Sequence, residues 1–146
     1  NGYDKYKETM PYTEEAKVLA KEDAKTTLFY SRLNTPLVDN RDYIIRCVDE
    51  SDWKDGKGYL KSSWKIVNDK DELVPRKPDV VRLTINEGYW LMEPREDGKK
   101  TFTTYYVYTV PGGSVPNWIA NKGNSMAVPK VFERIRAAVM AARAKK

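Results

Sequence analysis

With 146 residues, 40% of them hydrophobic and 32% charged, and no run near the ~18 apolar residues of a membrane span, the chain is predicted to form one water-soluble domain with a single core. The absence of histidine excludes Ser-His-Asp and Cys-His hydrolases and histidine-based zinc sites, and the single Cys47 excludes an intrachain disulfide and disfavours a cysteine-based metal site. The net charge of +5 favours an anionic partner, either a nucleic acid or an acidic membrane surface.

Six segments have strand character, and a short helical or irregular lead-in from Tyr3 to Tyr12 precedes them. The predicted strands cover residues 17–22, 26–32, 41–48, 59–67, 80–92 and 100–110. The short gap between the first two predicts a hairpin. The fifth segment is long, and we expect Asn86 to Gly88 to form a bulge that bends it.

Two of these strands have informative faces. The third places Tyr43, Ile45 and Cys47 on one face. The sixth carries apolar side chains on both faces, which predicts that both faces are at least partly covered. The apolar side chains of this sixth strand are Tyr105 and Val107 on one face and Phe102, Tyr106 and Tyr108 on the other.

Beyond Pro111, Gly112 and Gly113 the apolar period changes from two to 3.6, which predicts a long amphipathic C-terminal helix. Gly123 and Pro129 lie inside it and predict a kink or a short break. The apolar stripe consists of Trp118, Ile119, Val128, Val131, Phe132, Ile135, Ala138, Val139 and Ala142. An antiparallel sheet must cover its inner face, and this helix is the only large element available. The predicted class is α+β, a curved antiparallel sheet packed around the C-terminal helix.

Three segments carry motifs whose joint order and spacing are informative. Residues 36–43 read Pro-Leu-Val-Asp-Asn-Arg-Asp-Tyr, residues 80–94 contain Val-Val-Arg, Gly-Tyr-Trp and Glu-Pro, and residues 111–121 begin with Pro-Gly-Gly-Ser-Val-Pro-Asn-Trp. The three segments resemble parts of the START (steroidogenic acute regulatory protein-related lipid transfer) domains. The first is similar to that family's loop followed by an Arg-Asp-aromatic strand start, the second to its penultimate strand, and the third to the turn before its lid helix. This resemblance runs from about residue 16 to residue 136.

The resemblance implies a helix-grip fold and a hydrophobic tunnel that holds one lipid or other apolar molecule. It also implies one START-like domain over residues 1–146 that lacks the family's N-terminal helix and first strands. The ligand-binding residues that we predict are Arg41, Tyr43, Ile45, Tyr105, Val107, Trp118, Ile119, Val131, Phe132 and Ile135. We expect no catalytic residue, cofactor or metal.

Each of these residues also has a purely structural interpretation. The helix members suit ordinary core packing as well as a tunnel wall, and the tyrosines suit a half-buried sheet. For Arg41 we favour a structural role, an ion pair with Asp42 at the strand end. Because adjacent strand residues point to opposite faces, only one of the two can face a ligand.

Three hypotheses for function remain open. The first is a non-catalytic carrier of a lipid or sterol-like molecule, and the second is an enzyme of the same architecture, such as a cyclase, aromatase or hydrolase. Without histidine, such an enzyme needs a pocket carboxylate or a tyrosine with a shifted pKa. The third is an interaction domain whose interior is filled by side chains.

Partners and compartment follow from charge and from the sequence start. The basic residues outside the helix stripe could contact an anionic membrane transiently, although we favour the interpretation that they form a solvated helix face. These residues are Lys130, Arg134, Arg136, Arg143, Lys145 and Lys146. Nucleic-acid binding is disfavoured because bases and acids interleave and no recognition motif occurs. No secretory signal opens the sequence, and we expect a soluble protein of the cytoplasm or periplasm.

Overall fold

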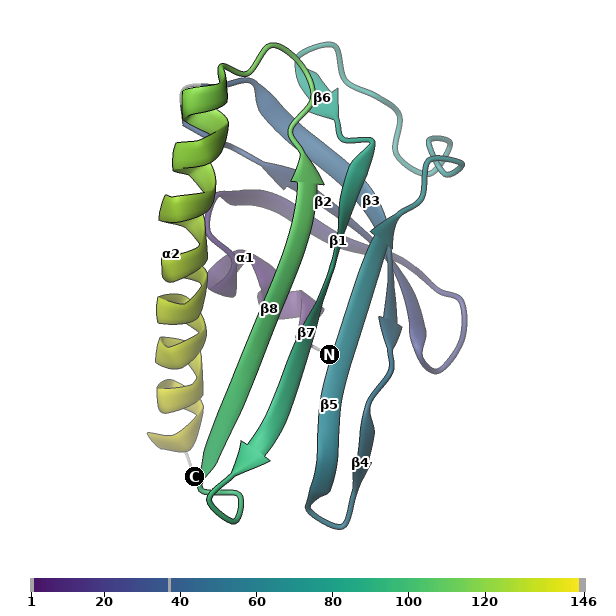
Figure 1. Cartoon of the computed structure of the whole chain (residues 1–146). Coiled ribbons are helices and arrows are strands. Elements are labelled where there is room, and N and C mark those ends of the chain that lie inside the picture. The colour runs from purple at the N-terminus through teal and green to yellow at the C-terminus, as the bar shows by residue number, and fades with distance from the viewer. Residues whose placement is uncertain (1, 37, 145–146) are drawn as a thin grey trace.

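A curved, mostly antiparallel sheet and a long C-terminal helix make up the fold (Figure 1). The computed structural model describes residues 2–36 and 38–144, and it describes the backbone alone at residue 4 and residues 117–124. The elements are η1 (Tyr3–Lys5), α1 (Tyr6–Thr9), β1 (Thr13–Lys21), β2 (Thr26–Leu33), β3 (Asn40–Asp49), β4 (Asp52–Lys54), β5 (Lys57–Ile66), β6 (Val80–Arg82), β7 (Ile85–Arg95), β8 (Lys100–Val110) and α2 (Asn117–Ala144). The sheet order is β1-β2-β3-β5-β7-β8, with β4 paired to β5 and β6 paired to β3. This arrangement confirms the predicted α+β class.

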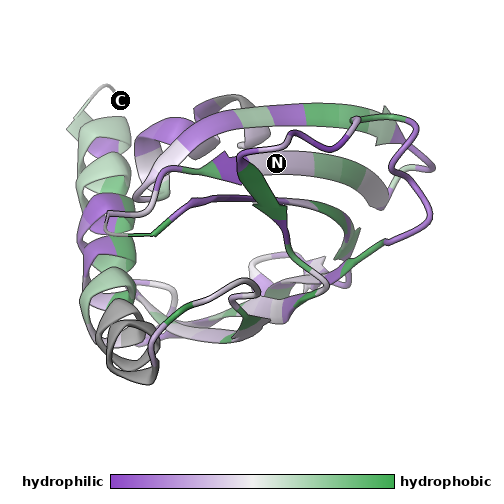
Figure 2. Ribbon diagram, turned by 90° about the horizontal axis from the view of Figure 1, so that it is seen from above, coloured by the Kyte–Doolittle hydropathy of each residue, from purple (hydrophilic) through white to green (hydrophobic). Residues whose placement is uncertain are grey.

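The first two strands form the predicted hairpin. Their turn is fixed by the Asp23 carboxylate, which accepts the backbone N–H groups of Lys25 at 2.6 Å and Thr26 at 2.8 Å. These hydrogen bonds also lower the pKa of Asp23. The hairpin forms one end of the curved sheet, and α2 lies opposite its concave face when the molecule is seen from above (Figure 2).

The predicted fifth strand is interrupted, and the position of the interruption differs from the expected bulge. Strand β6 pairs in parallel with β3, whereas β7 pairs antiparallel with β5 and β8, so the break falls between Arg82 and Ile85. Gly88 instead stands in regular register opposite Trp64. A Cβ atom at Gly88 would lie 2.6 Å from the Trp64 indole and would also clash with the Tyr106 carbonyl oxygen. Gly88 therefore provides space for an aromatic side chain.

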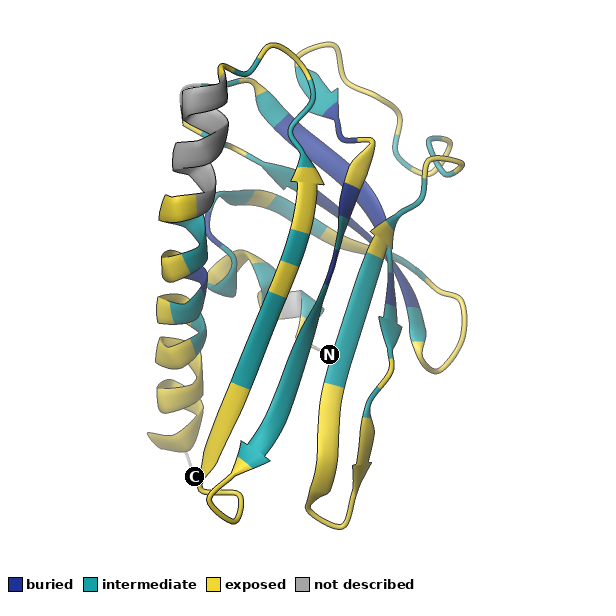
Figure 3. Ribbon diagram, in the orientation of Figure 1, coloured by how far each residue is buried: buried dark blue, intermediate teal, exposed yellow. Residues whose placement is uncertain are grey.

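The buried residues concentrate on β2 and β3 (Figure 3). On the concave side, a cluster joins these strands to the segment after β6; its members are Phe29, Tyr43, Ile45, Cys47 and Leu83. The predicted common face of Tyr43, Ile45 and Cys47 is thereby confirmed. The outer side of the same strands is also buried, with Leu28, Tyr30 and Ile44 almost fully covered.

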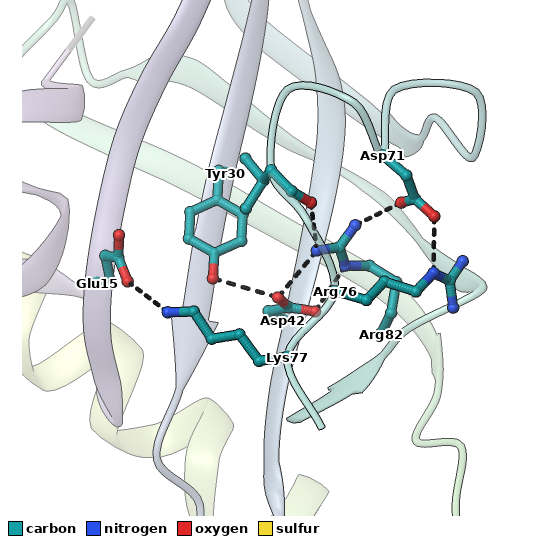
Figure 4. Close-up of polar contacts among 8 residues, drawn as sticks. Glu15, Tyr30, Asp42, Asp71, Arg76, Lys77 and Arg82 are labelled. Carbon is teal, nitrogen blue, oxygen red and sulfur yellow. Dashed lines mark hydrogen bonds and ion pairs between the residues drawn. The ribbon is translucent and has the colours of Figure 1, made fainter. Parts of the chain in front are cut away.

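An ion-pair network closes that outer side (Figure 4). Arg82 binds Asp42 through two contacts, Nε to Oδ1 at 2.6 Å and Nη2 to Oδ2 at 3.1 Å. Tyr30 donates its hydroxyl to Asp42 at 3.2 Å. The Arg82 guanidinium also donates to the Asp71 carboxylate at 2.5 Å and to the Val74 carbonyl at 3.1 Å. These contacts connect the segment between β5 and β6 to the sheet.

The outer face of β8 and the apolar stripe of α2 are covered only in part. On β8 this agrees with the prediction, because Phe102, Tyr106 and Tyr108 are each about half exposed. Among the described side chains of the α2 stripe, Val131 is buried and Val128, Phe132 and Ile135 are partly buried, whereas Ala138, Val139 and Ala142 are exposed. Of the predicted kink or short break between Gly123 and Pro129, the break is wrong, because α2 is continuous through both residues, and the kink stays a prediction. Within the described part of the chain, no helix is long and apolar enough to cross a membrane.

Candidate ligand-binding cavity

A cavity of about 690 Å³ lies between the concave face of the sheet, the N-terminal helices and α2. Strands β2, β3, β5, β7 and β8 supply its wall on one side, and residues 126–128 and Val131 of α2 supply the other. Thr35, Pro36, Val38, Pro111 and Val115 from two loops also line it. The volume is within the range of about 300–1,000 Å³ that small-molecule sites occupy.

The structure brings six of the ten predicted ligand-binding residues to this wall. They are Arg41, Tyr43, Ile45, Tyr105, Val107 and Val131. Phe132 is not among the residues that line the cavity, but its ring makes edge-to-face contacts with the rings of Trp90 and Tyr105, which do line it. Ile135 is half-buried and is not among the residues that line the cavity. The side chains of Trp118 and Ile119 lie outside the described residues.

Sequence reasoning missed several other wall residues, including Phe29, Trp64, Leu83, Asn86 and Trp90. Phe29 and Trp64 could have been found from strand parity, because they stand opposite the inward-facing Ile45 and Cys47. Trp90 and Asn86 could not, because the break before β7 changes which side chains of the predicted strand face inward. Asn86 is buried and accepts the Trp64 indole N–H at 3.0 Å.

Stacked aromatic rings form the wall nearest α2. Trp90 and Tyr105 stack with centroids 4.0 Å apart, and Trp64 stacks on Tyr105 at 5.9 Å. The edge-to-face contact of Phe132 with Trp90 therefore attaches the helix to β7 and β8.

On its other side α2 is attached to the N-terminal segment. The Lys130 ammonium donates to the Tyr12 hydroxyl at 3.2 Å, and Arg134 donates to the Met10 carbonyl at 3.3 Å. Two residues of the predicted basic face thus contact the N-terminal segment while they remain exposed to solvent. Of the rest of that face, Lys145 and Lys146 lie outside the described residues.

A few hydroxyl groups interrupt the apolar lining. The hydroxyls of Tyr6 and Tyr43 lie 3.3 Å apart inside the cavity wall. Burial raises the pKa values of Tyr6, Tyr43 and Tyr105 above the usual 10, since ionisation would place a charge in an apolar environment. These hydroxyls therefore stay neutral at physiological pH and can both donate and accept hydrogen bonds.

Arg41 is the charged residue of the wall. Its side chain is 5% exposed, and its guanidinium donates to the carbonyls of Pro111 at 3.3 Å and Gly112 at 3.4 Å and to the carbonyl of Asp39. The predicted ion pair with Asp42 is wrong, because Asp42 points to the outer face, where it binds Arg82. The expectation that only one of the two faces the interior is correct.

The described lining contains few acid–base groups. It contains no aspartate, glutamate or lysine among the described residues. Burial raises the pKa of the Cys47 thiol to about 11, which leaves little thiolate at neutral pH. In the described ranges 2–36 and 38–144, no three or more Cys, Asp or Glu side chains gather in an arrangement that could hold a metal ion.

Comparison with known proteins places this geometry in context. No family model matches the sequence. An uncharacterized protein of Pseudomonas aeruginosa is 33% identical over 104 residues, which cover 70% of this chain and 48% of that protein. The chain thus spans about half the length of this relative.

Solved structures of lipid transfer proteins share the fold. The STAR-related lipid transfer protein from Xanthomonas axonopodis superposes with a TM-score of 0.76 at 22% identity, over 94% of this chain and 73% of that one. Human StAR-related lipid transfer protein 5 gives a TM-score of 0.80 at 17% identity, over 95% of this chain and 65% of that one. Human STARD10 gives 0.78 at 20% identity, over 94% and 54%. The predicted resemblance is confirmed for the fold: the chain adopts the helix-grip fold of the START domains.

Proposed function

We propose that the 146 residues act as one START-like unit that binds a lipid or other hydrophobic small molecule in the cavity between sheet and helix. The observation that carries this proposal is the cavity itself, with its volume of about 690 Å³ and a wall made mostly of aliphatic and aromatic side chains. An interaction domain filled by its own side chains would leave no such space. Burial of a ligand's apolar surface would supply the affinity, at about 25 cal/mol per Å² of area removed from water.

The proposed activity is binding without chemical conversion. The competing enzyme hypothesis needed a carboxylate in the pocket or a tyrosine whose pKa approaches neutrality. The described lining has no carboxylate, and burial raises the pKa values of its residues Tyr6, Tyr43 and Tyr105, which moves them further from neutrality. A general base for a cyclase or hydrolase is therefore missing from the described wall.

Transfer of the ligand between membranes is the finer part of the proposal. The START proteins that share the fold are named lipid transfer proteins. Helix α2 and the loops that carry Pro36 and Pro111 border the cavity, and we place the entry and exit of the lipid at these elements.

The direct test is native mass spectrometry of the purified protein, followed by lipid extraction and by titration with fluorescent sterols and phospholipids. We expect co-purified lipid or uptake of one probe per chain. Absence of binding across a broad panel that includes sterols, phospholipids and fatty acids would refute the proposal.

A pair of variants on strand β8 connects binding to the cavity. Val107 lines the cavity, whereas its neighbour Tyr106 points outward and is about half exposed. Val107→Trp should fill part of the cavity and weaken probe binding at least 10-fold, whereas Tyr106→Trp should leave binding unchanged. Equal effects of the two substitutions would show that the probe binds elsewhere.

A further inference from the structure

The chain has two deeply buried arginines, and the structure neutralises only one of them. Arg82 contacts two carboxylates, those of Asp42 and Asp71. Arg41 is 5% exposed and contacts backbone carbonyls instead. None of the ion pairs formed by the residues that the structure describes involves Arg41. Its positive charge therefore has no anionic partner within the described protein.

An uncompensated guanidinium is an expensive group to bury. Carbonyl dipoles hold the Arg41 side chain in place, but they carry no net charge. A buried cation is normally paired with an anion, because its transfer from water without a counter-charge is strongly unfavourable. The side chain has five N–H donors, and the three carbonyls account for only part of that capacity.

The position of Arg41 within the cavity suggests which group could supply the missing charge. Arg41 lies at the end bounded by Pro36, Val38 and Pro111. From there the inward side chains of β3 continue to Cys47, a distance of about 20 Å along the strand, and the wall becomes apolar. One cation at the end of a long apolar surface matches a molecule with one anionic end and a hydrocarbon tail.

We infer that the cavity takes an amphiphile with a single anionic head group, a carboxylate or a phosphate monoester, and that this head group pairs with Arg41. The inference rests on the proposed function, because it specifies the ligand of the same cavity. A guanidinium recognises both kinds of oxyanion through paired N–H donors. The tail then extends along β3 past Tyr43 and Ile45.

The test compares ligands that differ only in charge at the head. Palmitate is paired with methyl palmitate, and hexadecyl phosphate with hexadecanol. Binding is followed by tryptophan fluorescence, because Trp64 and Trp90 line the cavity. A charge-assisted contact predicts that the wild-type chain binds at least one anion about 10- to 100-fold tighter than its neutral partner. Preference for palmitate alone identifies a fatty-acid head, and preference for hexadecyl phosphate alone identifies a phosphate monoester.

Variants on strand β3 locate the contact. Arg41→Gln should reduce the preference to less than about 3-fold, and Arg41→Lys should keep part of it. The control is Arg46→Gln, which removes an outward-facing cation that pairs with Glu22 at the surface and should keep the full preference. A preference that survives Arg41→Gln would overturn the inference.

The wild-type comparison decides even if Arg41→Gln fails to fold, since Arg41 also holds two loops. Equal affinity for anionic and neutral ligands would overturn the inference while the proposed function stands. Failure of all four ligands, together with failure of the broad panel, would instead refute the proposed function.

Discussion

Removal of the Arg82 side chain should destabilise the protein more than any surface substitution, because it leaves a carboxylate buried without its partner. Asp42 is 1% exposed, and after Arg82→Met it would keep only the Tyr30 hydroxyl at 3.2 Å. Breaking a buried ion pair from one side costs about 3–5 kcal/mol. At about 3 °C per kcal/mol for a chain of this size, the melting temperature should fall by about 9–15 °C.

The physical reason can be separated from simple loss of contacts by a second substitution. If the unpaired charge is the cause, then adding Asp42→Asn to Arg82→Met should recover part of the lost stability, because the amide is neutral. Urea unfolding followed by tryptophan fluorescence measures each free energy of unfolding. Arg76→Met is the matched control, since its ion pair with Asp71 at 2.6 Å is largely exposed and should contribute less than about 1 kcal/mol. Additive losses in the double variant would refute the reasoning.

Three further predictions concern packing and pH. Gly88→Ala should lower the free energy of unfolding by about 1–3 kcal/mol, because the new methyl group would overlap the indole of Trp64. The control Gly2→Ala has open space and should change it by less than about 0.5 kcal/mol, as measured by urea unfolding. Phe132→Ala should lower the free energy of unfolding by about 1–3 kcal/mol, because it removes the contact of α2 with Trp90. Met140 lies on the same helix and is 65% exposed, so Met140→Ala should lower it by less than about 0.5 kcal/mol in the same measurement. The buried tyrosines should not change the free energy of unfolding below pH 10, but they should lower it above pH 10. The reason is that tyrosines of the unfolded chain ionise near pH 10, whereas those of the folded chain keep their protons. Absorbance at 295 nm measures the ionisation, and urea unfolding across pH 9–12 measures the stability. The tyrosines concerned are Tyr3, Tyr6, Tyr30, Tyr43 and Tyr105.

Each of these predictions has a contradicting outcome. Equal stability of the two glycine variants would mean that the Trp64 ring does not pack against Gly88. An effect of Met140→Ala as large as that of Phe132→Ala would mean that the outer half of α2 is buried by something the described chain does not supply. Ionisation of all ten tyrosines near pH 10 in the folded protein would show that the cavity is open to water.

The sequence predicted best what short-range patterns determine. The inward face of β3 follows from strict alternation, and six of the ten predicted ligand-binding residues lie on the cavity wall. The C-terminal helix follows from its 3.6-residue period, but its exposed half does not. A stripe of alanine and valine is compatible with burial and with exposure, so the periodicity alone could not distinguish the two.

The break between β6 and β7 could not be predicted, because its cause lies in a distant part of the chain. Val81, Leu83 and Ile85 alternate without a glycine or proline that would signal an interruption. The interruption comes from β6 pairing with β3, where Arg82 stands opposite Asp42 and the Leu83 N–H donates to the Asp42 carbonyl at 2.9 Å. Long-range pairing of this kind overrides local strand propensity.

That single pairing also determines the charge of the cavity. In parallel register β6 places Arg82 beside Asp42 on the outer face and Val81 beside Arg41 on the inner face. The outer arginine thereby receives the nearest carboxylate, whereas the inner one has an aliphatic neighbour and the carbonyls of the loop after β8. A shift of β6 by one residue would move Arg82 inward and Val81 outward. The register between β3 and β6 therefore leaves one cation, Arg41, at the end of an apolar cavity. The described wall residues include no anion to pair with it.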